Sequence, residues 1–357
     1  MREFTLSYQW LSWRPSKAAP PLLPRGIERR FISTPAGDLE VLCAGPAQKG
    51  AAEGKRKPAL FFIHGGMGGA WVWLEYMQYF AAQGIPCYAL SLRGHGQSWQ
   101  PSYLRMVYGT GRQAMVDDLV AGIGYAEAQE WGREVVLVGH STGGALAQYV
   151  LSERLVRVRA LALLGAVPGT GSLEVYLSWW WLDPWFLLRM IFHGGHPNSP
   201  LSHPALTKAV FFSPDVSDDY VTSFQQRMCP YESYGWATAF MRPSSNLEFV
   251  LSQISGWGQA GQQQRLLVMT GGGDRITTVP IERKLAGRYR DAFAALVQAK
   301  KIDAEESPLA KLEGRLRLDE AGNGVRFNCV PIAGHHLQND AQWEVGAAKL
   351  LAFYEQL

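Results

Sequence analysis

A serine stands between glycines in the segment Gly139-His140-Ser141-Thr142-Gly143. The apolar run Val135 to Val138 precedes this segment, and a stretch of helical period follows it. A strand, a G-x-S-x-G pentapeptide and a helix in this order form a tight turn that exposes a nucleophilic serine. The flanking glycines leave room for the strand and the helix to approach each other. We therefore predict that Ser141 is a nucleophile, the alternative being a purely structural glycine turn.

A second glycine-rich segment is placed to stabilise an oxyanion. The apolar run Leu60 to Ile63 leads into His64-Gly65-Gly66-Met67. In acyl transfer to a serine, one backbone N–H comes from the residue after the nucleophile and another from the loop after an earlier strand. These rules predict an oxyanion hole formed by Thr142 and Gly66, with Met67 as the second choice for the loop donor.

The acid and the base should follow the serine in the chain if the serine lies on such a turn. The run Leu266 to Met269 leads through a glycine run into Asp274, which places a carboxylate at the end of a strand. The last apolar run leads through Gly334 into His335 and His336. We predict Asp274 as the acid and His335 as the base, because His335 directly follows the glycine. His336 is the alternative base, and otherwise a packing or gating residue.

These residue types together can carry out acyl transfer without a cofactor. A neutral imidazole removes the proton of the serine hydroxyl during its attack, and the carboxylate orients the ring and stabilises the imidazolium. The imidazolium then protonates the leaving group. The residues thus predict nucleophilic catalysis through an acyl-enzyme.

The composition excludes several other classes of function. The 357 residues include 34 Lys and Arg and 31 Asp and Glu, which gives a net charge of +3. Because the basic residues are scattered along the chain, we predict no nucleic-acid partner. The four cysteines lie far apart, and the loop that contains His193, His196 and His203 offers no matching carboxylates. We therefore predict reduced thiols and no metal site.

Targeting signals are also missing from the pattern. The first residues include an acidic side chain and no continuous apolar stretch, unlike a secretory signal. The most apolar run, Trp179 to Phe192, contains Asp183, Pro184 and Arg189 and is shorter than the roughly 20 residues that span a bilayer. We expect a cytoplasmic protein.

The elements that would position these side chains are short apolar runs alternating with segments of helical period. Apolar strands separated by helices are typical of a parallel sheet covered on both faces, so we predict an α/β fold. A hairpin of residues 29–34 and 39–42 should precede it. The predicted strands of the sheet are Leu60–Ile63, Cys87–Leu90, Val135–Val138, Leu161–Leu164, Leu266–Met269 and Val325–Val330.

One of the predicted helices has a clear buried face. Met115, Leu119 and Ile123 recur every four residues, which places them on one side of a helix. Asp117 and Asp118 lie near the start of this helix, where the helix dipole favours negative charge. We predict that both aspartates face water.

The alternation stops between Pro168 and Gln264, in an insertion that holds six of the 13 tryptophans. We predict that this insertion covers the serine with an apolar roof suited to a hydrophobic small-molecule substrate. In a second interpretation the aromatic residues form only the core of the insertion, and in a third they make weak contact with a lipid surface. The predicted substrate-binding residues are Trp180, Trp181, Trp185, Tyr231 and Trp236.

The segments as a whole resemble the α/β-hydrolase fold superfamily. The resemblance rests on His64-Gly65-Gly66, the elbow Gly139 to Gly143, Asp274, Gly334-His335 and the segment Ser91 to Ser98. It implies an eight-stranded, mostly parallel sheet flanked by helices, with a helical cap inserted after the sixth strand. The implied parts are an N-terminal arm (1–28), the hydrolase core (29–168 and 263–357) and an aromatic-rich cap (169–262). His95 within the resembling segment is expected to be structural.

The residues and the resemblance together predict an esterase- or lipase-like serine hydrolase. Its substrate would be a hydrophobic carboxylic ester or lactone, cleaved by a Ser-His-Asp triad. Relatives that open epoxides or remove halides attack with a carboxylate at the elbow, so Ser141 excludes those reactions. One alternative is acyl transfer, carbon–carbon bond cleavage or cyclisation by the same triad. Another is a small-molecule binding protein without catalysis. The sequence specifies no oligomeric state.

Overall fold

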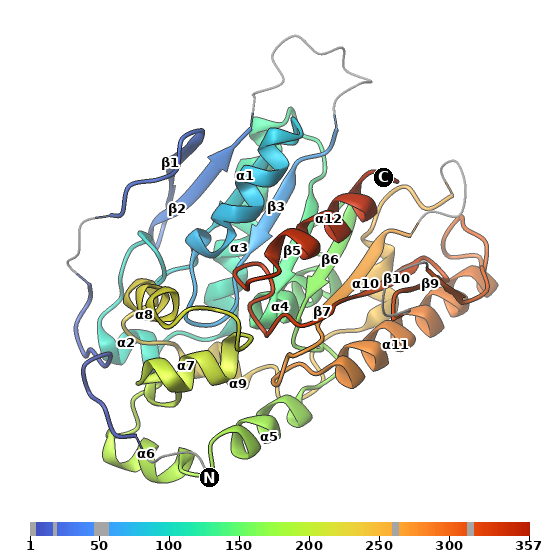
Figure 1. Ribbon diagram of the computed structural model, residues 1–357. Coiled ribbons are helices and arrows are strands. Elements are labelled where there is room, and N and C mark those ends of the chain that lie inside the picture. The colour runs from blue at the N-terminus through green and yellow to red at the C-terminus, as the bar shows by residue number, and fades with distance from the viewer. Residues whose placement is uncertain (1–4, 17–19, 46–56, 259–263, 313–317) are drawn as a thin grey trace.

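The computed structural model describes residues 5–16, 20–45, 57–258, 264–312 and 318–357 (Figure 1). Its strands are β1 (Ile27–Thr34), β2 (Gly37–Ala44), β3 (Leu60–Ile63), β4 (Cys87–Leu90), β5 (Val136–His140), β6 (Ala160–Leu164), β7 (Leu266–Gly271), β8 (Ala310–Lys311), β9 (Glu320–Gly322) and β10 (Val325–Val330). The helices are η2 (Ala70–Trp73), α1 (Leu74–Ala82), α2 (Tyr103–Val107), α3 (Arg112–Gln129), α4 (Ser141–Ser152), α5 (Leu173–Leu182), α6 (Phe186–Phe192), η3 (Ser199–Leu201), α7 (Pro204–Phe211), α8 (Asp218–Arg227), α9 (Tyr234–Thr238), α10 (Leu247–Ser252), α11 (Val279–Gln298) and α12 (Trp343–Tyr354).

The strands form a single sheet in the order β1-β2-β4-β3-β5-β6-β7-β10-β9-β8. Neighbouring strands from β4 to β10 in this order run parallel, and the strands at both edges pair antiparallel. The predicted hairpin is the β1–β2 pair. The predicted α/β fold with a mostly parallel sheet is confirmed.

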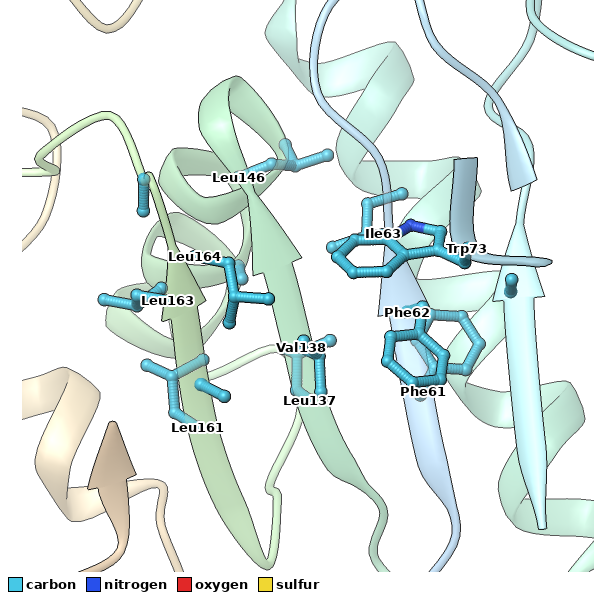
Figure 2. Close-up of a cluster of buried hydrophobic side chains, with 14 of the residues drawn as sticks. Phe61, Phe62, Ile63, Trp73, Leu137, Val138, Leu146, Leu161, Leu163 and Leu164 are labelled. Carbon is cyan, nitrogen blue, oxygen red and sulfur yellow. The ribbon is translucent and has the colours of Figure 1, made fainter. Parts of the chain in front are cut away.

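The central parallel strands are covered on both faces, because the helices that connect parallel strands pack on the two sides of the sheet. Every residue of β3, β4, β5, β6 and β7 is buried. Figure 2 shows side chains of β3, β5 and β6 in the core with Leu146 of α4 and Trp73 of η2. Such strands lack the polar alternation of a half-exposed sheet, which is why they are recognisable as continuous apolar runs.

The sheet has ten strands in the described part of the chain, where eight were expected. The two additional strands are β8 and β9, and they come from the charged segment that follows α11. Strand β9 pairs antiparallel with β10, and β8 pairs with β9. Edge strands tolerate charged side chains because one side of them is open to water, and the composition of this segment therefore gave no strand signal.

Helices cover both faces of the sheet (Figure 1). Helices α1 and α12 contact each other on one face, whereas α3 contacts α4 on the other. Helix α11 packs against β7 and β10, and α10 packs against α4 and α11. None of the helices in the described part of the chain combines the length and the apolarity needed to cross a bilayer.

One prediction for α3 was wrong. Asp117 is exposed as expected, but Asp118 is buried. The Asp118 carboxylate accepts hydrogen bonds from the backbone N–H of Arg93 and from its guanidinium, at 2.6–2.9 Å. The helical period alone could not reveal this ion pair, because Arg93 lies on a loop that is distant in the sequence.

The segment between β6 and β7, for which we keep the name cap (169–262), contains helices α5 to α10. In Figure 1, α5, α6, α7 and α9 lie together at one end of the sheet, and α6 and α5 are the outermost. The loops that carry the predicted site residues reach the same end of the molecule. The cap is therefore placed to cover them.

Candidate active site

Ser141 lies on a sharp turn between β5 and α4. Strand β5 ends at His140 and α4 begins at Ser141, with no loop between them. The backbone of Ser141 has a φ of 53°, in the left-handed region that L-residues rarely adopt. A Cβ atom on Gly143 would lie 2.1 Å from the carbonyl oxygen of His64, and one on Gly65 would lie 2.6 Å from Cβ of Ser141. Close packing therefore requires glycine at both positions, and Gly143 is one of the two glycines that the predicted tight turn needs.

His335 meets Ser141 from the loop that follows β10. Its Nε2 atom lies 2.9 Å from Oγ of Ser141, and the ring is almost completely buried. This distance is within the range of a hydrogen bond between a nucleophile and its base. The structure thus brings together two residues that are 194 positions apart in the sequence.

Asp274 lies on the other side of the His335 ring, in the loop after β7. Its Oδ2 atom lies 2.9 Å from Nδ1 of His335 and accepts the hydroxyl of Thr277 at 2.8 Å. Its Oδ1 atom accepts the backbone N–H groups of Ile276 at 2.8 Å and Thr277 at 3.0 Å. Both oxygens of Asp274 thus act as hydrogen-bond acceptors. Nδ1 of His335 therefore carries hydrogen, which leaves Nε2 free to accept a proton from Ser141.

His336 does not face the serine. Its ring packs against His140, Phe211 and Phe224, with ring centroids 4.5–4.9 Å apart. Burial lowers the pKa of both His140 and His336 well below its usual value, so both rings are neutral. Nε2 of His140 lies 3.0 Å from the carbonyl oxygen of His335 and donates to it. Of the two adjacent histidines, His335 therefore points at the serine, and His336 packs beside it.

The two glycine-rich segments meet next to the serine. Gly66, Met67 and Thr142 all line the cavity into which Ser141 opens. A Cβ atom on Gly66 would lie 4.0 Å from Oγ1 of Thr142, so the two predicted donor residues are adjacent. The N–H of Met67, however, donates to Oε2 of Glu232 at 2.6 Å. This hydrogen bond occupies the N–H of Met67, so Gly66 stays the first choice for the loop donor.

Glu232 belongs to the cap and was not predicted from the sequence. It is buried, and its Oε2 atom lies 2.9 Å from Nε2 of His95. Burial opposes both charges, but the charge of Glu232 raises the pKa of His95 well above its usual value. Against its own burial, the charge of His95 and the hydrogen bonds that Glu232 accepts lower the pKa of Glu232 to about 2. The two side chains form a buried ion pair beside the segment His64-Gly65-Gly66-Met67, which is predicted to serve an oxyanion and which we call the oxyanion loop.

A second buried carboxyl group lies near the triad. Glu282 of α11 is fully buried. Burial, and in addition the negative charge of Asp274, raises the pKa of Glu282 well above its usual range. Glu282 is therefore neutral.

Ser141 and His335 open into a cavity of about 470 Å³ between the core and the cap. Leu177 of α5 and Leu187 of α6 line this cavity and are also more than half exposed, so the cavity meets the surface between these two helices. The walls are mostly apolar. They are formed by Gly66, Met67, Ser141, Thr142, Val167, Val175, Tyr176, Leu177, Trp179, Phe186, Leu187, Pro197, Pro200, Leu201, Phe211, Glu232, Ser233, Tyr234, Thr238, Ile276 and His335.

The aromatic lining differs from the prediction. Trp181 is 85% exposed and Trp185 is partly exposed, and neither lines the cavity. Tyr231 and Trp236 are fully buried in the cap–core joint, where they donate to the carbonyl oxygen of Pro101 and to Oε1 of Glu232, respectively. The side chain of Trp180 lies outside the described residues. The aromatic residues that do line the cavity are Tyr176, Trp179, Phe186, Phe211 and Tyr234.

The three histidines of the cap loop have separate partners. His193 Nδ1 lies 2.9 Å from Oγ of Ser199, His196 Nε2 lies 3.0 Å from the carbonyl oxygen of Ser12, and His203 caps α7. They do not converge on one point. Within the described residues, one group has the spacing of metal ligands: the side-chain ligand atoms of His95, Cys229 and Glu232 lie within 4.8 Å of one another.

Comparison with known proteins gives the same architecture. The model of the Alpha/beta hydrolase family matches residues 60–306. The enol-lactonase of Burkholderia xenovorans LB400 is similar in structure with a TM-score of 0.58 at 13% identity, over 91% of this chain and 100% of the enol-lactonase. An esterase of Thermogutta terrifontis matches with a TM-score of 0.57 at 17% identity, over 92% and 98% of the two chains. The 2-hydroxy-6-oxo-6-phenylhexa-2,4-dienoate hydrolase of Rhodococcus sp. strain RHA1 matches with a TM-score of 0.53 at 17% identity, over 92% and 99%.

Proposed function

The chain belongs to the alpha/beta hydrolase family, and we propose that it is a serine hydrolase that cleaves a hydrophobic carboxylic ester or lactone. The observation that carries the proposal is the continuous chain of hydrogen bonds from Ser141 through His335 to Asp274. Ser141 and His335, at one end of this series of hydrogen bonds, line an apolar cavity. Under this proposal the nucleophile, the base and the orienting acid already lie within hydrogen-bond distance of one another before a substrate binds.

Acylation would begin with attack of Ser141 Oγ on the carbonyl carbon of the substrate. His335 Nε2 takes the hydroxyl proton as the new C–O bond forms, and Asp274 stabilises the resulting imidazolium. The negative charge passes to the carbonyl oxygen, which the N–H groups of Gly66 and Thr142 would stabilise. Collapse of this intermediate breaks the ester bond, and the alcohol leaves with the proton from His335.

Deacylation would repeat these steps with water as the nucleophile. His335 removes a proton from the water as it attacks the acyl carbon, and then returns a proton to Ser141 Oγ as the acid leaves. In a lactone the acyl and alcohol parts are one molecule, so the product is a single hydroxy acid.

The cavity walls support the choice of substrate. Trp179, Phe186 and Phe211 offer broad apolar contact area close to the serine, which favours a bulky or long acyl group. Glu232 is the one carboxylate among the cavity-lining residues, and its charge is balanced by His95. An uncharged hydrophobic ester therefore fits this lining better than a charged one.

The test is a panel of p-nitrophenyl esters of increasing acyl length together with lactones of increasing ring size. Wild type should hydrolyse them with a rate that increases with acyl size, and Ser141→Ala should lose this activity. A fluorophosphonate should label wild type at Ser141 with a stoichiometry of one. Equal rates in wild type and Ser141→Ala would refute the proposal. No hydrolysis and no labelling of wild type would refute it as well and would favour a binding protein.

Product analysis separates hydrolysis from the related reactions. If the enzyme is an acyltransferase, an added alcohol or amine acceptor will divert most of the acyl product from the free acid. If it cleaves carbon–carbon bonds, vinylogous 1,5-diketones will react faster than esters. Both outcomes retain the triad and change only the substrate class.

A further inference from the structure

Met67 is held by the cap at both of its backbone polar groups. Its N–H donates to Oε2 of Glu232 at 2.6 Å, and its carbonyl oxygen accepts the N–H of Cys229 at 3.0 Å. The φ angle of Met67 is 64°, a left-handed conformation that costs free energy for any residue with a Cβ atom. A segment of the cap thus holds the oxyanion loop in a strained conformation.

The Glu232 carboxylate fits this position because every neighbouring polar group is a donor. Oε2 accepts from Met67 and faces Nε2 of His95, while Oε1 accepts the N–H of Ser233 at 2.7 Å and Nε1–H of Trp236 at 2.8 Å. A glutamine has only one acceptor oxygen. In either orientation of its amide, an NH₂ group would face donors, so the carboxylate cannot be replaced by its neutral isostere.

His95 completes the arrangement as an imidazolium. Its Nδ1 atom lies 2.9 Å from the carbonyl oxygen of Arg93, and its Nε2 atom lies 2.9 Å from Oε2 of Glu232. Both ring nitrogens thus face acceptors, which requires a hydrogen on each. The positive ring balances the carboxylate, so that no net charge of this pair opposes an oxyanion nearby.

The pair lies beside the predicted oxyanion donor. Gly66 directly precedes Met67, and a Cβ atom on Gly66 would lie 3.5 Å from Oε2 of Glu232. The N–H of Met67 belongs to the peptide plane that joins Gly66 and Met67, so its hydrogen bond to Glu232 fixes the orientation of that plane. With this plane fixed, the backbone of Gly66 has fewer conformations, and its N–H has fewer directions in which to point.

We propose that Glu232, held by His95, is a positioning residue that locks the Met67 backbone so that the N–H of Gly66 faces the oxyanion. This inference rests on the proposed hydrolase function and extends it, because it makes the cap part of the catalytic geometry and not only a wall of the cavity. Preorganised donors lower the barrier because they need no reorientation during the reaction.

Hydrogen exchange tests the lock independently of activity. The Met67 amide should be protected in wild type and should exchange at least about tenfold faster in Glu232→Gln, as read residue by residue by mass spectrometry. Ser152→Ala is the matched control, because it removes another cap–core hydrogen bond, from the N–H of Asn246 at 2.8 Å, that does not involve the oxyanion loop. An unchanged Met67 exchange rate in Glu232→Gln would refute the proposal.

Kinetics test the consequence of the lock. Glu232→Gln should lower kcat for a p-nitrophenyl ester about 10- to 100-fold and change KM by less than about threefold, because a displaced donor weakens binding of the transition state more than of the substrate. The rate of fluorophosphonate labelling should fall in parallel, while the final stoichiometry stays at one. Ser152→Ala should keep the wild-type kcat.

A second substitution isolates the backbone effect. Glycine adopts a positive φ without strain, so a Met67→Gly backbone should depend less on the hydrogen bond to Glu232. The loss of kcat caused by Glu232→Gln should therefore be several-fold smaller in a Met67→Gly background than in wild type. An equal loss in both backgrounds would mean that Glu232 acts in some way other than on the Met67 backbone, and would overturn the proposal.

Two further outcomes are distinguishable. If wild-type Ser141 does not react with the fluorophosphonate, the proposed function fails and the positioning role with it. If wild type and Glu232→Gln react equally fast, only the positioning role fails.

A metal analysis of the purified protein tests the ion pair itself, since the ligand atoms of His95, Cys229 and Glu232 are close enough to share a metal. One equivalent of a transition metal in wild type that is lost in His95→Gln would overturn the ion-pair description.

Discussion

Thr277 donates its hydroxyl hydrogen to Oδ2 of Asp274 at 2.8 Å, the same oxygen that faces His335. The backbone N–H of Thr277 donates to the other carboxylate oxygen. Thr277 therefore orients Asp274 from two directions. The carboxylate can meet the imidazole in one position only, and this position selects the hydrogen on Nδ1 of His335.

Replacement of Asp274 by Asn tests this selection. The Asn oxygen would turn to the two backbone N–H groups, and its NH₂ group would face Nδ1 of His335. The ring would then carry its hydrogen on Nε2 and could not accept a proton from Ser141. We expect kcat for esters to fall by about 1,000- to 10,000-fold without a large change in KM. Thr277→Val replaces only the hydroxyl, by a methyl group, and should lower kcat less than about tenfold. A smaller loss of kcat in Asp274→Asn than in Thr277→Val would contradict the assignment of Asp274 as the acid.

The adjacent histidines should respond differently to substitution. His335→Gln removes the base and should lower kcat at least about 1,000-fold. His336→Gln should keep activity within about tenfold of wild type, because the ring packs against Phe211 and does not face the serine. It should instead lower the free energy of unfolding by about 1–3 kcal/mol, as measured by chemical denaturation. A greater loss of activity in His336→Gln than in His335→Gln would reverse their roles.

Two tryptophans on the same helix provide a test of the cavity. Trp179 lines the cavity, whereas Trp181 of the same helix is 85% exposed and does not. Trp179→Ala should lower kcat/KM for long-chain esters about tenfold through lost apolar contact, and much less for an acetyl ester. Trp181→Ala should leave both values within about twofold. Chain-length profiles of the two variants check this prediction, and an equal effect of both substitutions would contradict the observed lining.

The buried His64 should make stability depend on acidity. Burial, and to a lesser extent the charge of His95, lowers the pKa of His64 to about 3. Between about pH 3 and 6.5, the unfolded chain binds a proton at this ring that the folded chain does not, so stability should decrease as the pH falls. One such group contributes up to about 1.4 kcal/mol per pH unit. The slope of unfolding free energy against pH should therefore be smaller by about this amount in His64→Gln between pH 4 and 6, and an unchanged slope would contradict the prediction.

The core was predictable because its signals are local. Buried parallel strands must be apolar on both faces, and each predicted central strand agrees with the observed one within two residues at either end. The turn at Ser141, the glycine run before Asp274 and the glycine before His335 are short motifs at strand ends. Since the carboxyl ends of parallel strands meet at one edge of a sheet, these motifs predicted a common site, and the structure brings the three side chains within hydrogen-bond distance.

The cap was much less predictable from its sequence. Its helices are short, and apolar residues occur on several faces, so periodicity does not show which side chain turns inward. Trp181 was expected at the substrate and is exposed, while Trp236 is buried against Glu232. Glu232 itself stands in no recognisable motif. Only its contacts with His95 and Met67, which come from two other loops, distinguish it from an ordinary surface glutamate.

Sequence alone determined the order of the central strands and the identity of the residues at their ends, because burial and tight turns restrict residue types over a few neighbouring positions. Tertiary structure decided which of two adjacent histidines faces Ser141, which amide of the oxyanion loop is taken by a carboxylate, and which aromatic side chains enclose the cavity. Those choices depend on atoms from segments more than a hundred residues apart, as in the contact of Glu232 with His95, and no local pattern records such distances.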